Sequence, residues 1–331
     1  TAYRRQRQMC IRDRIGTDVS GGAKVDHIKD DDTFGGVFGV TKGLAKKYSR
    51  KRVIDTPIAE HITLSTAVGA AATGLRPIAE LMFNDFIGFG LDPILNQGAK
   101  MRYMFGGKAK IPLVVRTVHG AGASAAAQHS QSLYNMFAAI PGVKVVVPSN
   151  PYDAKGLLMS AIQEDNLVVF SEDKTLLGQK GNVPEEPYTI EIGKANVTRE
   201  GDDLTIVAIG KMVAVAEETA EKLAEDQVSV EVIDLRSVSP WDQETVLDSV
   251  KKTGRLIVID ESNPQCNIAG DVASVIGDVG FDYLDGPIKK VTAPDTPVPF
   301  AANLEAAYMP NADKVLDIAS ELIDDLKKAN A

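Results

Sequence analysis

The segment VHGAGASAAAQHSQ (residues 118–131) contains the chain's densest group of side chains suited to catalysis. Among its glycine, alanine and serine residues stand His119, Gln128 and His129. Small residues let the backbone approach a ligand closely, and α/β proteins bind ligands in loops that follow parallel strands. An imidazole there could orient a substrate or stabilise charge. Taken alone, the segment equally fits a glycine-rich loop with a surface histidine, which is the commoner case.

Two other segments place candidate residues just after predicted strands. Glu60 ends the segment DTPIAE (55–60) and offers a carboxylate for chemistry. Alternatively, it only faces the positive end of a helix dipole, an interaction worth about 0.3–1 kcal/mol. The segment LMFNDF (81–86) is rich in large apolar side chains. Such a segment is more often part of a core than a platform for a cofactor.

The chain lacks the sequence marks of a self-contained phosphate or metal site. There is no G-x-x-x-x-G-K-[ST] motif, and the glycines at 120 and 122 lack the third glycine and the acid of a dinucleotide fold. The nearest approach to a magnesium-diphosphate GDG segment is GDD at 201–203, a weak match. The histidines form no H-x-x-x-H or H-x-H pair, which disfavours a catalytic metal held by this chain alone; they are His27, His61, His119 and His129.

Composition places these residues in a soluble, two-domain protein. The 331 residues are 44% hydrophobic and 24% charged, and at about 100–200 residues per domain they suffice for two cores. The net charge of −9 disfavours a nucleic-acid or anionic-membrane surface. No apolar run approaches the ~18–20 residues that span a bilayer. Because Cys10 and Cys266 are the only cysteines, we expect a reducing, cytoplasmic compartment.

Alternating short strands and helices predict an α/β fold. Short apolar strands separated by helices favour a mostly parallel sheet with helices on both faces. A linker rich in glycine, proline and charge, with at most one edge strand, separates this part from a second, smaller α/β domain. In the first part we predict strands over 52–54, 78–83, 111–116, 143–147 and 167–170, and helices over 62–73, 92–105, 130–139 and 153–163. In the second we predict strands over 204–209, 228–233 and 256–260, and helices over 213–225, 242–252 and 269–279.

The first 14 residues, TAYRRQRQMCIRDR, differ from everything that follows. They contain five arginines and one aspartate and show no apolar period. No apolar stretch of the kind found in a signal peptide follows them. The string resembles translated sequencing-adapter read-through, so we treat residues 1–14 as a foreign segment. The predicted organisation is then a first domain over 15–180, a linker over 181–200 and a second domain over 201–331.

Taken in order, the quoted segments resemble the β subunits of the decarboxylating components of 2-oxoacid dehydrogenase complexes. The resemblance covers residues 15–328 and implies a transketolase-like pyrimidine-binding domain followed by a transketolase C-terminal domain. Four further segments most resemble the acetoin dehydrogenase branch of that family; they are MRYMFGGKAKIPLVVR, VPEEPYTI, ANVTREGDDLTIVAIGKMV and VTAPDTPVPF. The resemblance to the family as a whole rests on the segments VIDTPIAE, GLRPIAELMFNDF, GAGASAAAQHSQSLY, IPGVKVVVPSNPYDAKGLL and DLRSVSPWDQETVLDSVKKTGRLIVIDE.

The resemblance implies thiamine diphosphate as a cofactor shared between two kinds of subunit. Glu60 matches the glutamate that hydrogen-bonds a pyrimidine nitrogen and thereby activates the thiazolium. Phe86 matches the aromatic ring that stacks on the pyrimidine, with Ile58 and Met82 as its neighbours. His129 matches the histidine that reaches the reacting carbon. One departure is Thr17, which stands where the family commonly has an acid beside this pocket.

The resemblance also implies partners. An α subunit holds magnesium and the diphosphate, the assembly is an α2β2 heterotetramer, and the acyl group passes to a lipoyl-bearing acyltransferase. The second domain mainly mediates subunit contacts and docking to that acyltransferase. A potassium site made chiefly of backbone oxygens is implied at Leu113, Ala161, Ile162, Glu164 and Asn166.

Three readings of function follow. The first is an enzyme subunit that cleaves acetoin, or alternatively pyruvate or a branched-chain 2-oxoacid. The second is a catalytically silent assembly subunit, which the presence of Glu60, Phe86 and His129 opposes and Thr17 slightly favours. The third is a stand-alone transketolase-like enzyme, which would bind the cofactor without a partner.

Overall fold

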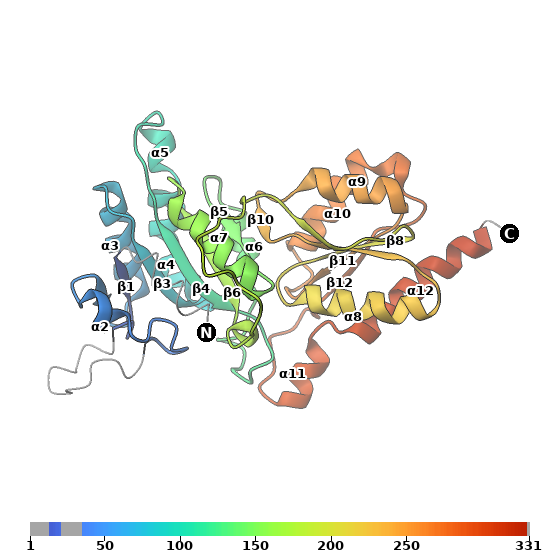
Figure 1. The fold of residues 1–331 in the computed structure, drawn as a ribbon, viewed down its shortest axis with the longest axis horizontal. Helices are drawn as coiled ribbons and strands as arrows, with labels where there is room; N and C mark the ends of the chain where they lie inside the picture. Colours follow the sequence, from blue (N-terminus) through green and yellow to red (C-terminus); the bar gives the residue numbers. More distant parts are fainter. Residues whose placement is uncertain (1–12, 21–34, 330–331) are drawn as a thin grey trace. The chain divides into compact units, whose positions relative to one another are not determined.

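A computed structural model describes residues 13–20 and 35–329 of the chain, in two compact units (Figure 1). The first unit comprises Thr1–His119, Met136–Val146 and Asn150–Ile192; the second comprises Gly120–Asn135, Val147–Ser149 and Gly193–Ala331. Most of the segment predicted to be foreign, and His27, lie outside the described residues. None of the helices in the described part of the chain combines the length and apolar character that a membrane crossing requires.

The first unit is built on a parallel sheet whose own strands lie in the order β5-β6-β4-β3-β1-β2. Helix α7 covers one face, and α3 packs on β1 and β3. The strands are β1 (Arg14–Gly16), β2 (Val53–Asp55), β3 (Ile78–Phe83), β4 (Val114–His119), β5 (Lys144–Val146) and β6 (Val168–Asp173). The helices are α2 (Leu44–Tyr48), α3 (Glu60–Ala72), α4 (Ile87–Asp92), α5 (Met101–Met104), α6 (Tyr134–Ala138, shared with the second unit) and α7 (Pro151–Gln163).

Helix α7 shows how local sequence and packing agree in this unit. The Asn150 side chain accepts a hydrogen bond from the backbone N–H of Asp153 at 2.9 Å, and Pro151 occupies the first turn, where its missing N–H costs nothing. One face of the helix is apolar and packs on the sheet. The resulting core contains Ile78, Val114, Val146, Leu157, Leu158, Ala161, Ile162, Val168 and Phe170.

Three predictions for this unit were wrong in detail. The strand expected over 111–116 is β4, which lies three residues later, at Val114–His119. The helix expected over 92–105 is three pieces: α4 ends at Asp92, a π-helix spans Pro93–Gly98, and α5 spans Met101–Met104. Pro93 has no N–H to donate, so an ordinary α-helix cannot continue through it without losing a hydrogen bond. The helix expected over 130–139 is only Tyr134–Ala138. The strand over 78–83 is confirmed.

A row of buried charges crosses the middle of the sheet. Arg116 pairs with Glu80 on β3 and Glu172 on β6, and Arg14 Nη1 lies 3.6 Å from Glu80. Burial raises the pKa of Glu172 well above its ordinary value and lowers that of Arg14 to about 10. No guanidinium nitrogen of Arg14 donates a hydrogen bond to a described residue. A buried cation with few hydrogen-bond partners is costly to a fold.

The second unit is a smaller α/β domain, as predicted, with strand order β12-β11-β8-β9-β7. Only β7 is antiparallel, and it is the single edge strand expected in the linker. Figure 1 shows α8 and α12 on one face of this sheet and α9 and α10 on the other. The strands are β7 (Asn196–Arg199), β8 (Leu204–Ala208), β9 (Val230–Asp234), β10 (Ser237–Ser239), β11 (Leu256–Asp260) and β12 (Lys289–Thr292). The helices are α8 (Met212–Glu225), α9 (Gln243–Thr253), α10 (Ile268–Val279), α11 (Ala302–Tyr308) and α12 (Ala312–Ala329).

Candidate active site

Asp55 and Thr56 tie the end of β2 to the end of β1. The Asp55 carboxylate accepts hydrogen bonds from the backbone N–H and the hydroxyl of Ser20, each at 2.7 Å. The backbone N–H of Thr56 donates to the carbonyl oxygen of Gly16 at 3.0 Å. These bonds fix the path of the chain as it leaves the sheet and enters α3.

Glu60 is the first residue of α3 and is half-buried. The hydroxyls of Thr56 and Thr63 lie 2.9 Å apart, which attaches the first turn of the helix to the connection before it. Ala59 precedes the helix without a side-chain cap, so the free N–H groups and the positive end of the dipole favour the Glu60 carboxylate. A first-turn acid and a functional acid are therefore compatible in this position.

The end of β3 provides an aromatic surface at the same edge of the sheet. β2, β1 and β3 are parallel neighbours, so the residues that follow them emerge at one edge, where α/β sheets bind ligands. Met82 and Phe86 are half-buried there, and the Phe86 ring packs edge-on against Phe83 at a centroid distance of 5.9 Å. Asn84 between them is fully buried, and its amide group bonds to no described residue.

Helix α3 packs closely on α4. A Cβ added at Gly90 would lie 2.2 Å from Leu64 Cδ1, so only glycine allows the two helices this approach. Both helices begin at this edge, because Glu60 opens α3 and Phe86 immediately precedes α4. The carboxylate and the aromatic ring are thus positioned by the same pair of helices.

The residues at this edge fit a flat, nitrogen-containing ring. A carboxylate can accept from a ring N–H or protonated nitrogen, a phenyl ring can stack on the ring face, and a thioether packs well beside it. Ile58, two residues before Glu60, is 82% exposed, an apolar side chain that nothing in the described part of the chain covers. Thr17 is half-buried just after β1, at the same edge. Asn84 adds a buried polar group that has no hydrogen-bond partner among the described residues.

His129 belongs to the second unit, whereas Ile58, Glu60, Met82 and Phe86 belong to the first. It is half-buried, and its backbone N–H donates to the carbonyl oxygen of Ala126 at 3.3 Å. His119 ends β4, is buried, and lies with Nδ1 2.7 Å from the Ser171 hydroxyl.

The positions predicted to hold potassium lie together at the amino edge of the first sheet. Leu113 precedes β4, Ala161 and Ile162 are in the last turn of α7, and Glu164 and Asn166 are in the turn that leads to β6. Carbonyl groups at a helix C-terminus attract cations. The location is therefore electrostatically suitable.

Arg76 already fills part of that location. Its guanidinium donates to the Ile162 carbonyl from Nε at 3.0 Å and Nη2 at 2.8 Å, to the Glu164 carbonyl at 2.7 Å and to the Asp165 carboxylate at 2.9 Å. A carbonyl oxygen has two lone pairs, so the Ile162 oxygen has none left. With Arg76 in this position, these residues do not fit an added potassium ion. Potassium binding at these residues stays a prediction. Arg76 was not predicted as part of this location, although it stands two residues before the strand expected over 78–83.

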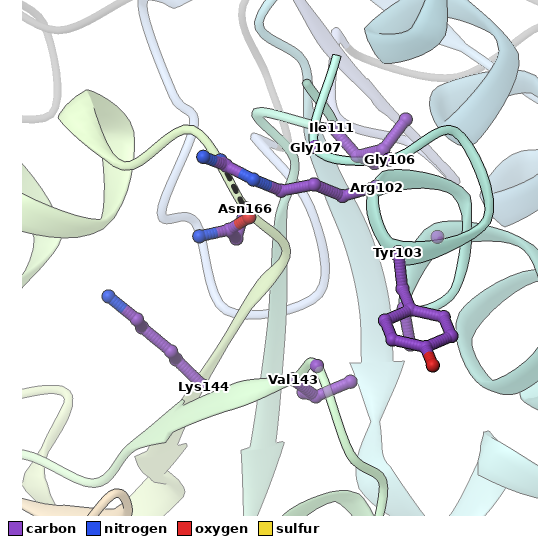
Figure 2. A pocket seen from close by; sticks show the side chains of 11 residues that line it. Arg102, Tyr103, Gly106, Gly107, Ile111, Val143, Lys144 and Asn166 are labelled. Carbon is purple, nitrogen blue, oxygen red and sulfur yellow. Dashed lines mark hydrogen bonds between the residues drawn. The ribbon is translucent and has the colours of Figure 1, made fainter. Parts of the chain in front are cut away.

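A cavity of about 710 Å³ also lies at this amino edge (Figure 2). Arg102 Nη1 donates to Asn166 Oδ1 at 3.0 Å, and Lys144 pairs with the Glu164 carboxylate at 2.5 Å. Its cations thus have partners within the chain, and the cavity opens opposite the edge that carries Glu60. None of the residues predicted to hold the cofactor lines it. Its lining is Gly98, Ala99, Arg102, Tyr103, Gly106, Gly107, Ile111, Gly142, Val143, Lys144 and Asn166.

The two units and the Glu60 edge define a transketolase-like protein. Residues 16–180 match the transketolase pyrimidine binding domain, and residues 193–315 match the transketolase C-terminal domain. The chain shares its fold with a solved structure described as a split gene transketolase, inactive beta4 tetramer, at a TM-score of 0.76 and 22% identity, over 98% of this chain and 95% of that one.

Curated relatives give the family. The acetoin:2,6-dichlorophenolindophenol oxidoreductase subunit beta of Bacillus subtilis (strain 168) is 58% identical over 93% of this chain and 90% of its own length. The protein of the same description from Cupriavidus necator is 51% identical over 91% and 88%. The pyruvate dehydrogenase E1 component subunit beta of B. subtilis is 44% identical over 88% and 89%. The chain belongs to this family of β subunits of thiamine-diphosphate-dependent dehydrogenases.

Proposed function

We propose that this chain is the β subunit of an enzyme that cleaves acetoin and transfers the acyl group to a lipoyl carrier. The 58% identity to an acetoin oxidoreductase β subunit carries the choice of substrate. Breaking the central carbon–carbon bond of acetoin releases acetaldehyde and leaves a two-carbon unit at the same oxidation level. The lipoyl disulfide oxidises that unit to an acetyl thioester, while its S–S bond is cleaved and its second sulfur becomes a thiol.

Glu60, Phe86, Met82 and Ile58 hold the pyrimidine half of thiamine diphosphate in this proposal. When bound, the cofactor supplies a nucleophilic carbon and an electron sink for carbon–carbon cleavage. Glu60 accepts a hydrogen bond from the pyrimidine ring and keeps a proton at that nitrogen, and Phe86 stacks on the ring. The helix terminus that favours the Glu60 carboxylate supports this role.

His129 orients the substrate or the incoming lipoyl group and stabilises charge at the reacting carbon. Its loop is nearly free of bulky side chains, which leaves room for a ligand to approach. Thr17 stands beside the pocket in place of an acid, so the pocket has a hydroxyl there instead of a carboxylate. The presence of Glu60 and His129 opposes the alternative of a silent assembly subunit.

An α subunit completes the site, in an α2β2 heterotetramer with a lipoyl-bearing acyltransferase as its acceptor. It would supply the magnesium and diphosphate contacts for which this chain has no motif. The uncovered Ile58 beside Glu60 supports a site that is closed by a cofactor and a partner. The cysteine content supports our prediction of a cytoplasmic location.

The test is to assay the complex of this chain with an α partner on acetoin and on pyruvate, using dichlorophenolindophenol as electron acceptor. We expect kcat/KM for acetoin to exceed that for pyruvate by about 10-fold or more, a difference of about 1.4 kcal/mol. Acetoin turnover no better than without substrate would reject the proposal. Turnover of pyruvate but not of acetoin would instead assign the chain to the pyruvate dehydrogenase branch, which includes the 44% identical relative.

A further inference from the structure

The loop that carries His129 contains serine and alanine residues in the left-handed backbone region, which their own residue types disfavour. Gly120, Gly122, Ser124 and Ala126 all have positive φ, at 98°, 101°, 49° and 61°. Serine and alanine in this region are strained and keep such a conformation only where the surroundings impose it. The surroundings that impose it are therefore part of how His129 is held.

Glu305 on α11 is the main constraint on this loop. Its carboxylate accepts the backbone N–H of Gly122 on Oε1 and that of Ser124 on Oε2, both at 2.8 Å, with the Ser124 hydroxyl 3.5 Å from Oε2. Glu305 is only 2% exposed. Hydrogen bonds to a buried carboxylate are about twice as strong as neutral ones, and successive N–H groups of a strained turn form a natural nest for an anion. One side chain thus holds two of the loop's strained residues.

A second carboxylate supports the beginning of the loop. Glu261 accepts the backbone N–H of Ala121 at 2.6 Å. Lys211 donates to the Ala121 carbonyl oxygen at 2.6 Å and pairs with Glu261 at 3.0 Å. The Ala121 side chain is fully buried in a small apolar cluster with Ala293, Val298 and Tyr308.

The far end of the loop is held independently. The Tyr134 hydroxyl donates to Asp260, and the Asn135 side-chain amide donates to the Cys266 carbonyl oxygen at 2.8 Å. His129 stands midway between Ser124 and Tyr134. Its placement therefore depends on bonds at both ends of the loop, of which those to Glu305 also hold the residues with positive φ.

We propose that Glu305 is a positioning residue for His129, acting by holding the 120–126 backbone in its strained conformation. This inference rests on the proposed function, because it assumes that His129 acts on the substrate or lipoyl group. Glu305 lies 181 residues from Ser124 along the chain. It is in none of the sequence segments on which the family resemblance rests. It touches neither substrate nor cofactor in this proposal.

The experiment compares Glu305→Gln with Glu231→Gln in the complex with the α partner. A glutamine at 305 can accept only one of the two N–H groups and turns its own NH2 toward the other. Glu231 is a matched control: it is buried in the same unit and pairs with Lys252, and no described contact joins it to the loop. Glu305→Asp keeps the carboxylate on a shorter side chain and serves as the milder variant should Glu305→Gln fail to assemble.

Three measurements are made on each complex: hydrogen exchange of peptides covering 120–131, thiamine diphosphate affinity, and kcat. For Glu305→Gln we expect exchange in this loop to accelerate about 10-fold or more and kcat to fall about 10- to 100-fold, with cofactor affinity within about 2-fold of the wild type. Glu305→Asp should give smaller changes in the same direction. Glu231→Gln should leave all three quantities unchanged.

A double-mutant cycle with His129→Ala decides whether Glu305 acts through His129. If it does, adding a Glu305 substitution to His129→Ala lowers kcat no further than about 2-fold. A full multiplicative loss in the His129→Ala background, or unchanged loop exchange in the single variant, would overturn the inference. If His129→Ala alone has no effect, the proposed role of His129 fails instead, and lack of any turnover by the wild type rejects the proposed function.

Discussion

The two edges of the first unit's sheet treat their polar groups in opposite ways. At the amino edge, Arg76 satisfies the end of α7, and Lys144 and Arg102 pair with neighbouring side chains. At the carboxyl edge, Ile58 is uncovered and Asn84 is buried without a partner among the described residues. Charges that satisfy one another stabilise a fold, whereas groups left incomplete await a ligand. The cavity at the amino edge is therefore the less informative feature, and the smaller set of residues around Glu60 is the cofactor site that we propose.

The largest expected effect is the loss of activity in Glu60→Gln. Removing the carboxylate removes the group that holds the proton at the pyrimidine, so turnover should fall by about 10²- to 10⁴-fold. The melting temperature should change little, because Glu60 is half-buried and no described residue depends on it for an ion pair. Acetoin assays and thermal unfolding of the assembled complex measure the two effects. Unchanged turnover would mean that Glu60 is only a first-turn acid.

Arg76→Met should have the opposite profile. The variant leaves the carbonyl groups of Ile162 and Glu164 without their donor, and we expect a loss of about 2–3 kcal/mol in the free energy of unfolding. Turnover in complexes that remain folded should stay near that of the wild type. Urea unfolding together with kcat measures both, and a large loss of kcat at unchanged stability would break the distinction between the two edges.

The same variant tests the potassium prediction. With Arg76 in place, replacing potassium by choline at equal ionic strength should barely move the melting temperature, because the Ile162 oxygen is already saturated. In Arg76→Met the vacated carbonyls can accept the ion, so potassium should stabilise the variant more than the wild type. Equal and large stabilisation of both proteins would show that potassium binds without displacing Arg76.

A smaller effect is expected from pH at the amino edge. Hydrogen bonds from Lys110 and then Arg76 lower the pKa of Asp165 from 3.8 to about 2. Because the folded pKa lies below the unfolded one, the resulting stability is fully present above about pH 4 and is lost as pH falls toward 2. The difference in melting temperature between wild type and Asp165→Asn should therefore shrink on going from pH 7 to pH 3. A difference that stays constant over this range would contradict this assignment.

Much of the architecture could be predicted because it is local. Apolar runs such as 78–83 and 256–260 match β3 and β11 residue for residue, and Asp242 caps α9 where the pattern starts that helix. The strand β1 was not predicted, because residue 14 was assigned to the foreign segment and the two remaining residues form no apolar run. The residues of the site came from resemblance to a family, since a lone acid at a helix start has no distinctive local pattern.

The sequence by itself determined the two α/β units, their order and the family, because periodicity, turn residues and a long series of motifs are all written along the chain. Only the tertiary structure decided which buried polar groups find hydrogen-bond partners. Arg76 meets the end of α7 across 86 residues, and Glu305 meets Gly122 across 183. Such contacts depend on how strands and helices pack, and short-range spacing contains no trace of them.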